Sequence, residues 1–336
     1  MEKEALFYKK VSSKIVQCQL CPHFCTLNYS EKGKCGARKN LNGKLISLVY
    51  EKPCSIAIDP IEKKPLFHFL PGKKTLSIAT LGCNLNCKHC QNFQISQPKI
   101  EKTRGFKIKA KEVVKQAIKN KSKIISYTYT EPTIFYEYML DICKEANKNN
   151  VRNVTVTNGF INPEPLKKLC KYLDASNIDL KSINNDFYEN ICEARIAPIL
   201  ESIKLMHKEG IWIELTNLLI PGFNDSEKDI IKLVTWIKNN LGEEVPLHFS
   251  AFYPCNKMLN IPPTDPKTVI NARKIAMNLG LKYVYTGNLH NTEGETTYCP
   301  ECNKALIIRK GYEIIENNLK KGKCSYCGKS IAGVWE

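Results

Sequence analysis

Three cysteines within eight residues carry the clearest chemical signal in this sequence. Cys83, Cys87 and Cys90 are spaced so that each thiolate can bind one iron of a [4Fe-4S] cube, and no fourth cysteine follows at close range. Zinc normally takes four protein ligands, and the only further candidate nearby, His89, stands between two of the cysteines. The spacing therefore predicts a [4Fe-4S] cluster with one open iron, and a zinc knuckle is the alternative.

Two further groups of cysteines flank this trio among the 16 cysteines of the chain. The C-terminal group consists of two Cys-x-x-Cys pairs, which is typical of a zinc ribbon or rubredoxin-like site, and we predict structural zinc with iron as the alternative. The N-terminal group can close a tetrahedral site, and its spacing fits zinc or a second iron–sulfur cluster equally well. The C-terminal ligands are Cys299, Cys302, Cys324 and Cys327, and the N-terminal ligands are Cys18, Cys21, Cys25 and Cys35.

The other five cysteines stand alone, and we expect them to be small buried hydrophobic residues. They are Cys54, Cys143, Cys170, Cys192 and Cys255.

Short apolar runs alternate with longer segments of helical periodicity between the flanking cysteine groups. Such alternation indicates βαβ units and a parallel sheet, so we predict an α/β fold, a partial or full (β/α) barrel of the TIM type. The predicted strands are Thr75–Thr80, Ile124–Tyr129, Asn153–Thr157, Asn177–Leu180, Trp212–Leu219 and Leu247–Phe252. The predicted helices are Lys111–Asn120, Thr133–Asn149, Pro165–Tyr172, Pro198–Glu209, Asp229–Asn239 and Pro266–Leu279.

Three parts of the chain follow from these patterns. Residues 1–72 form a cysteine-rich N-terminal module that ends near the turn residues Pro71 and Gly72. Residues 73–297 form the barrel domain, and residues 298–336 form a zinc-ribbon or rubredoxin-like module.

Polar residues at the ends of the predicted strands are expected to meet the cysteine trio. The trio itself follows the first strand, where the active sites of barrels are built. Glu214 and His248 interrupt apolar runs on later strands, and since unpaired burial is costly, they are candidates for catalysis inside the barrel. The strand-end candidates for cofactor binding are Thr130, Glu131, Asn158, Asp179 and Lys181.

The overall composition points to a folded protein with a strongly basic surface. Net charge is +17, from 50 Lys and Arg against 33 Asp and Glu. An RNA or an acidic protein is one partner class that this charge suits, and a lysine-rich solvated surface is the alternative. No apolar run approaches the roughly 18 residues that span a bilayer, and the first ten residues lack a secretory signal. We expect a cytoplasmic protein that does not enter the membrane.

The spacing of the cysteine trio resembles that of the radical S-adenosylmethionine (SAM) superfamily. The neighbouring sequence is similar to its glycyl-radical-enzyme activases, such as the pyruvate formate-lyase activating enzyme. Over nearly its full length the chain resembles the radical SAM member of the AmmeMemoRadiSam system. The matching stretches are Cys18–Cys25, Asp59–Phe69, the cysteine loop with Gln91-Asn92, Tyr127–Thr133 and the C-terminal cysteine pairs.

This resemblance implies a reaction and its cofactors. The open iron would chelate SAM, and the reduced cluster would cleave it to methionine and a 5'-deoxyadenosyl radical, which takes hydrogen from a substrate. His89 stands where the family usually places an aromatic residue against the adenine. Glu131 follows Tyr129 and Thr130, which replace two glycines of the family segment that meets the methionine amino group. Lys181 would meet the SAM carboxylate.

The resemblance also implies partners for an oxidoreductase of this kind. They are AMMECR-type and MEMO-type proteins and an electron donor such as ferredoxin or flavodoxin. A glycyl-radical-enzyme activase is the first alternative, and a non-catalytic zinc- or nucleic-acid-binding protein is the second. RNA, a protein and a metabolite all remain open as substrates.

Overall fold

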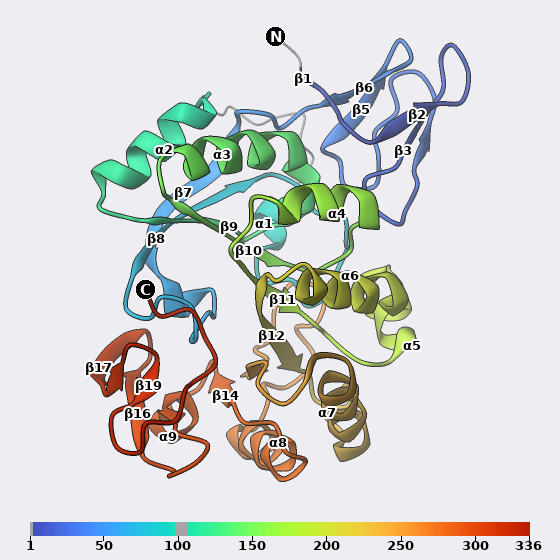
Figure 1. The fold of residues 1–336 in the computed structure, drawn as a ribbon. Coiled ribbons are helices and arrows are strands. Elements are labelled where there is room, and N and C mark those ends of the chain that lie inside the picture. The colour runs from blue at the N-terminus through green and yellow to red at the C-terminus, as the bar shows by residue number, and fades with distance from the viewer. Residues whose placement is uncertain (1–2, 98–106) are drawn as a thin grey trace.

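A single large sheet organises the computed structural model, which describes residues 3–97 and 107–336 (Figure 1). Its strand order is β14-β13-β12-β11-β10-β9-β8-β7, and all neighbours are parallel except β7 and β8. The strands are β7 (Pro53–Pro60), β8 (Lys74–Thr80), β9 (Ile124–Tyr127), β10 (Arg152–Thr157), β11 (Ala175–Asp179), β12 (Trp212–Leu219), β13 (Leu247–Ala251) and β14 (Val284–Gly287). β7 and β14 form the two edges and do not pair with each other among the described residues. The predicted α/β fold is confirmed, in its partial-barrel form.

Helices follow the parallel strands and cover the outer face of this sheet (Figure 1). Helix α7 shows why they form: Ser226 accepts a hydrogen bond from the backbone N–H of Asp229 at the N-terminus, and the buried residues recur at helical spacing on one face. The helices are α1 (Phe93–Ser96), α2 (Ala110–Lys119), α3 (Tyr136–Lys148), α4 (Pro163–Cys170), α5 (Asn185–Phe187), α6 (Ile196–Lys208), α7 (Glu227–Leu241), α8 (Pro266–Asn278) and α9 (Thr292–Glu295). Short 3-10 turns are η1 (Ile61–Lys63) and η3 (Pro132–Phe135), and η4 (Tyr188–Cys192) is a π-helical turn.

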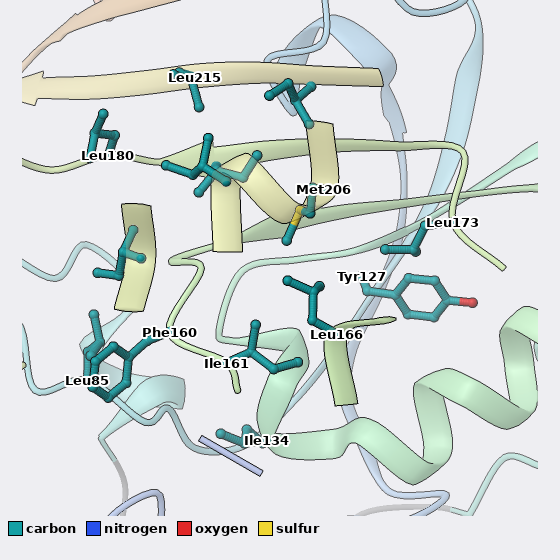
Figure 2. Packing of buried hydrophobic residues seen from close by; sticks show 14 of the residues in the cluster. Leu85, Tyr127, Ile134, Phe160, Ile161, Leu166, Leu173, Leu180, Met206 and Leu215 are labelled. Carbon is teal, nitrogen blue, oxygen red and sulfur yellow. The ribbon is translucent and has the colours of Figure 1, made fainter. Parts of the chain in front are cut away.

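The core lies between the sheet and these helices. All four residues of β9 are buried, because a parallel strand with both faces covered meets no water. Figure 2 shows Leu215 of β12 and Leu180, the residue after β11, in one cluster with Met206 from α6 and Leu166 from α4. Leu85 of the cysteine loop and Phe160 belong to the same cluster, so the loop is anchored in the core.

Two strands of the large sheet escaped the sequence analysis. β14 has only four residues, which is too short for a clear period, and β7 begins and ends with proline, which is typical of an edge strand. β7 lies before residue 72, yet it pairs along its length with β8. The six predicted strands and six predicted long helices are present, with ends shifted by a few residues.

Small sheets form the regions on either side. Near the N-terminus, β1 (Lys3–Glu4), β6 (Lys44–Ser47) and β5 (Arg38–Leu41) make one sheet, and β2 (Tyr8–Lys10), β3 (Val16–Cys18) and β4 (Thr26–Leu27) make another. Near the C-terminus, β15 (Thr297–Tyr298), β16 (Ala305–Lys310) and β17 (Glu313–Asn317) precede the pair β18 (Leu319–Lys320) and β19 (Lys323–Cys324). None of the helices in the described ranges is long and apolar enough to cross a membrane.

Candidate functional site

The cysteine loop leaves the C-terminal end of β8 and is held from behind by η4. The backbone N–H of Asn86 donates to the carbonyl oxygen of Cys192 at 3.1 Å, and that of Lys88 donates to Ile191 at 2.9 Å. Below the loop, the side-chain amide of Asn84 donates to the carbonyl of Phe160 at 2.7 Å. The loop that carries the thiols is therefore fixed by backbone contacts with segments distant in sequence.

A cavity of about 470 Å³ opens beside this loop, within the usual size range of small-molecule sites. Its lining contains all three thiols of the trio. The six residues predicted to bind a cofactor line the same cavity: His89, Thr130, Glu131, Asn158, Asp179 and Lys181. The tertiary structure thus brings together side chains from the cysteine loop and from the ends of three successive strands.

The separation of the three thiols fits a cluster better than a single ion. Four thiolates on one zinc ion, each about 2.3 Å from the metal, lie about 3.8 Å apart. Within the described ranges, the sulfurs of Cys83, Cys87 and Cys90 do not form a group whose members all lie within 4.8 Å of one another. Thiolates that each bind a different iron of a cube are spread more widely, so the donor set fits a [4Fe-4S] cluster.

A fourth thiol, that of Cys192, lies within 4.8 Å of the Cys87 sulfur but does not line the cavity. Cys87, His89 and Cys192 have ligand atoms within 4.8 Å of one another, but one ion at that point would leave Cys83 and Cys90 without a metal. A hydrogen bond from Cys192 lowers the pKa of the Cys87 thiol against the effect of burial, which favours the thiolate that iron requires.

His89 presents a neutral ring to this cavity. Burial, followed by the nearby charge of Lys181, lowers the pKa of His89 to about 3. Its Nδ1 atom is buried and has no hydrogen-bond partner among the described residues. A buried polar atom without a partner is costly, so the site is suited to a ligand that supplies a hydrogen bond or a stacking surface there.

Lys181 and Asp179 form an ion pair at the cavity wall, with Nζ 2.9 Å from Oδ2. Burial alone would lower the pKa of Lys181, but Asp179 and the thiols of Cys87 and Cys192 outweigh it and hold the pKa well above its usual range. Lys181 therefore keeps its positive charge, which suits it to an anionic group such as a carboxylate.

Glu131 is fully buried and joins the ends of β9 and β10. Its carboxylate accepts hydrogen bonds from the backbone and hydroxyl of Thr133 at 3.0 and 2.7 Å, from the hydroxyl of Thr157 at 2.7 Å and from the backbone of Asn158 at 2.8 Å. Burial raises the pKa of Glu131 against these four hydrogen bonds. Asn158 in turn donates to Asn84 Oδ1 at 2.9 Å, so Glu131 helps to position the cysteine loop.

Tyr129, which the sequence resemblance matches to a glycine, adopts a left-handed backbone with φ of 64°. Its hydroxyl donates to Asp59, and the ammonium of Lys64 lies 4.8 Å from the centre of its ring. Asp59 also accepts from Ser77 at 2.6 Å. No local pattern marked these partners, although Asp59 and Lys64 lie in a stretch that carried the family resemblance.

Three further residues of the cavity lining, named below, come from outside the strand ends. Lys63 and Lys64 belong to the segment after β7, and Tyr312 lies in the turn between β16 and β17. Tyr312 is half exposed. No local signal marked it, because only the packing of the C-terminal region brings it near the cysteine loop.

Glu214 and His248, the candidates for catalysis, do not line this cavity. Glu214 is completely buried and accepts from the backbone N–H groups of Phe67 and His68 at 3.0 and 2.8 Å and from the indole of Trp212 at 3.1 Å. His248 Nε2 lies 2.7 Å from the same carboxylate. These contacts give the pair a role in holding the segment before β8 against β12 and β13.

The C-terminal cysteines lie close enough to share a single ion. Cys299 and Cys327 have sulfurs 3.6 Å apart, and Cys302 and Cys324 have sulfurs 3.7 Å apart. These separations match the edge of about 3.8 Å expected for four thiolates on one ion with metal–sulfur bonds of about 2.3 Å. The donor set therefore fits a mononuclear metal site.

The five isolated cysteines have mixed surroundings. Cys143, Cys170 and Cys192 are buried as expected, and Cys255 is partly buried. Cys54 is exposed, so the expectation of burial was wrong there, because β7 turns this residue away from the core on an edge strand.

Comparisons with known proteins agree with this geometry. Residues 77–234 match the model of the radical SAM superfamily. An uncharacterized protein of Methanocaldococcus jannaschii is 46% identical over 98% of each chain. A pyruvate formate-lyase-activating enzyme of Staphylococcus epidermidis is 26% identical over 50% of this chain and 70% of that enzyme. Among solved structures, Streptococcus suis SuiB bound to S-adenosylmethionine has a TM-score of 0.52 and 14% identity, covering 68% of this chain and 53% of that one, which is a likeness of fold.

Proposed function

Because this chain carries a radical SAM superfamily domain and belongs to one family with the Methanocaldococcus protein, we propose that it binds a [4Fe-4S] cluster and SAM and modifies a substrate by hydrogen abstraction. The observation that supports this proposal best is one cavity that contains both the three thiols, whose sulfurs do not all lie within 4.8 Å of one another, and all six residues predicted to bind a cofactor. When bound and reduced, the cluster supplies the electron that cleaves SAM to methionine and a 5'-deoxyadenosyl radical.

The chain's own residues would bind and orient SAM in this cavity. Cys83, Cys87 and Cys90 would hold three irons and leave one open. Lys181 carries the charge that suits the SAM carboxylate, and Asp179 fixes its direction through the 2.9 Å ion pair. The neutral ring of His89, with its unpartnered Nδ1, offers a planar surface and one polar atom to the adenine.

Thr130 and Glu131 would shape the end of the cavity that receives the methionine amino group. The hydroxyl of Thr130 donates to the carbonyl of Thr80 at 2.8 Å, which fixes the loop against the end of β8. The left-handed Tyr129 turns the backbone here in place of the family's glycine.

The reaction class has a direct test. Cys83→Ala removes one iron ligand, and we expect reductive cleavage of SAM to fall to background, because a cluster held by two thiolates is lost. The measurement is anaerobic incubation with dithionite followed by chromatography for 5'-deoxyadenosine. Exposed Cys54→Ala is the matched control and should retain the wild-type yield. An undiminished yield from Cys83→Ala would contradict the ligand assignment.

A glycyl-radical-enzyme activase is the second candidate function. The similarity to pyruvate formate-lyase-activating enzymes over half of the chain favours it. The activity would differ in leaving a stable radical on a protein partner, which electron paramagnetic resonance of a mixture with that partner would detect.

The remaining assignments belong to the same proposal. Membership of the AmmeMemoRadiSam system, with AMMECR-type and MEMO-type partners and a ferredoxin or flavodoxin as electron donor, rests on the sequence resemblance. Zinc in the C-terminal site rests on the spacing of the two Cys-x-x-Cys pairs and on sulfur separations of 3.6 and 3.7 Å. A cytoplasmic location rests on the composition.

A further inference from the structure

We propose that Cys18, Cys21, Cys25 and Cys35 hold a second [4Fe-4S] cluster, and not a zinc ion. The spacing of these residues in the sequence fits both possibilities. The arrangement of the thiols, compared with the two other cysteine sites of the same chain, favours the cluster. This inference does not depend on the proposed reaction.

All four thiols line one small cavity in the N-terminal region. Cys18 ends β3, and its backbone N–H donates to the carbonyl of Cys25 at 3.0 Å, so the chain between them forms a closed loop that carries Cys21. Cys35 comes from the next loop, before β5. The lining also contains the apolar side chains of Leu20, Leu27 and Ile134, together with the polar side chains of His23, Asn84 and Thr133.

The sulfur separations distinguish the two kinds of centre. In the C-terminal site, all four ligand atoms lie within 4.8 Å of one another, as thiolates on a single ion must. In the region of residues 3–97, neither the trio beside the main cavity nor the N-terminal four contains such a compact set of thiols. Nevertheless, each of these groups shares one cavity. The N-terminal thiols therefore lack the compact arrangement that a single ion requires, which favours ligands that bind different irons of one cube.

A buried cation lies against the N-terminal thiols. The guanidinium of Arg38 lines the cavity, and its Nη1 lies 3.7 Å from the sulfur of Cys18. Its Nη2 lies 2.5 Å from the carboxylate of Glu137, and the Arg38 side chain is only 2% exposed. Nε of Arg38 is buried and has no partner among the described residues. A cluster with four thiolate ligands is anionic, and a buried cation beside it compensates that charge.

The two cysteine regions adjoin. His23 Nε2 lies 2.7 Å from the carbonyl oxygen of Asn84, which is the residue after Cys83. A further cavity is lined by both Cys35 and Cys83. The second cluster would therefore lie beside the first. Each of its four irons would be bound by a protein thiolate, so no iron would be open to a substrate.

The experiment counts metal in full-length protein that is purified and reconstituted without oxygen. The variant C83A/C87A/C90A removes the first cluster and leaves the N-terminal region intact. We expect it to retain about four iron and four sulfide per chain, half of the wild-type content, with the visible absorption of an iron–sulfur cluster and a paramagnetic signal after dithionite. The reciprocal variant C18A/C21A should lose the same amount. Cys170→Ala is the control for a buried cysteine outside every site.

Several results would overturn the proposal. C83A/C87A/C90A without iron but with about two zinc ions per chain would assign zinc to both flanking sites. About two iron per chain in that variant would indicate a smaller cluster. Unchanged iron in C18A/C21A would also contradict it. Circular dichroism checks folding, and if C18A/C21A fails to fold, the other variant still decides. The proposed reaction fails separately, when wild type cleaves no SAM while C83A/C87A/C90A keeps its iron.

Discussion

Tyr129 has a left-handed backbone at a position where the sequence resemblance implies a glycine. A left-handed backbone disfavours side chains with a Cβ, so a tyrosine persists there only when its surroundings hold it. Asp59 accepts its hydroxyl, and Lys64 lies over its ring. Burial would raise the pKa of Asp59, but hydrogen bonds from Lys64, Ser77 and Tyr129 outweigh it and hold that pKa well below its usual range. Burial lowers the pKa of Lys64 to about 8.

Replacement of the Asp59 carboxylate should therefore lower the free energy of unfolding. Asp59→Ala leaves the ammonium of Lys64 buried without its partner, and we expect a loss of about 3–5 kcal/mol in the free energy of unfolding. Lys63→Ala is the matched control, because Lys63 binds the same carboxylate at 2.9 Å from a more exposed position, and its loss should cost about 0.2–1 kcal/mol. Urea denaturation of the metal-free proteins measures both. Equal costs would show that burial of Lys64 does not matter.

Within the sheet, Glu214 joins β12 to the segment between β7 and β8. Burial would raise the pKa of Glu214, but the contact with His248 outweighs it, so the pKa is lowered and the carboxylate is charged. Two backbone N–H groups of the segment, from Phe67 and His68, donate to it. Backbone donors in a buried place need an acceptor, and this sequence supplies one from the sheet.

If Glu214 mainly accepts these backbone hydrogen bonds, its replacement should lower the stability of the fold. The sequence had made Glu214 a candidate for catalysis. Glu214→Ala leaves two buried N–H groups unpaired, at about 1–3 kcal/mol each, so the melting temperature should fall markedly. Glu201→Ala, in an exposed part of α6, is the control and should leave it unchanged. A variant of Glu214 with full stability and no SAM cleavage would instead support a catalytic role.

The C-terminal region is joined to the barrel through a buried polar network. His68 Nδ1 lies 2.6 Å from the carbonyl of Ala332, and its Nε2 lies 2.5 Å from the hydroxyl of Tyr285. Arg309 donates to the carbonyl of Phe67 at 2.8 Å. The backbone of Val334 pairs with the segment around Phe69, and Figure 1 shows the C-terminus beside that segment. Contacts across this interface place Tyr312 at the main cavity.

The interface should weaken in acid. Burial lowers the pKa of His68 from its ordinary value of 6.5 to about 4, so between these values the unfolded chain binds a proton that the folded chain does not. The stability of the fold therefore falls as the pH falls from about 6.5 to about 4, by at most about 1.4 kcal/mol per pH unit from this residue.

Urea midpoints between pH 7.5 and 4.5 test this expectation. His68→Gln should be less stable at neutral pH and should show a shallower loss on acidification than wild type. His207→Gln, at an exposed position of α6, is the matched control. An identical pH dependence in wild type and His68→Gln would exclude His68 as a source of acid sensitivity.

Local patterns in the sequence determined the alternation of strands and helices and the three groups of cysteines. Periodicity and close spacing are properties of a short stretch of chain, so they survive without knowledge of the fold. The same holds for the residues predicted to bind a cofactor. A residue that follows a parallel strand lies at the C-terminal end of the sheet, where the active sites of barrels are built.

Which segments far apart in the chain meet follows from the packing of the folded protein. This packing brought Lys64 and Tyr312 to the main cavity and paired β7 with β8. It also buried Glu214 where backbone N–H groups donate to its carboxylate. It also made the C-terminal thiols a compact set within 4.8 Å of one another, which the N-terminal thiols are not. These results depend on packing between segments far apart in the chain, and sequence spacing sets the order of ligands but not the distances between their sulfurs.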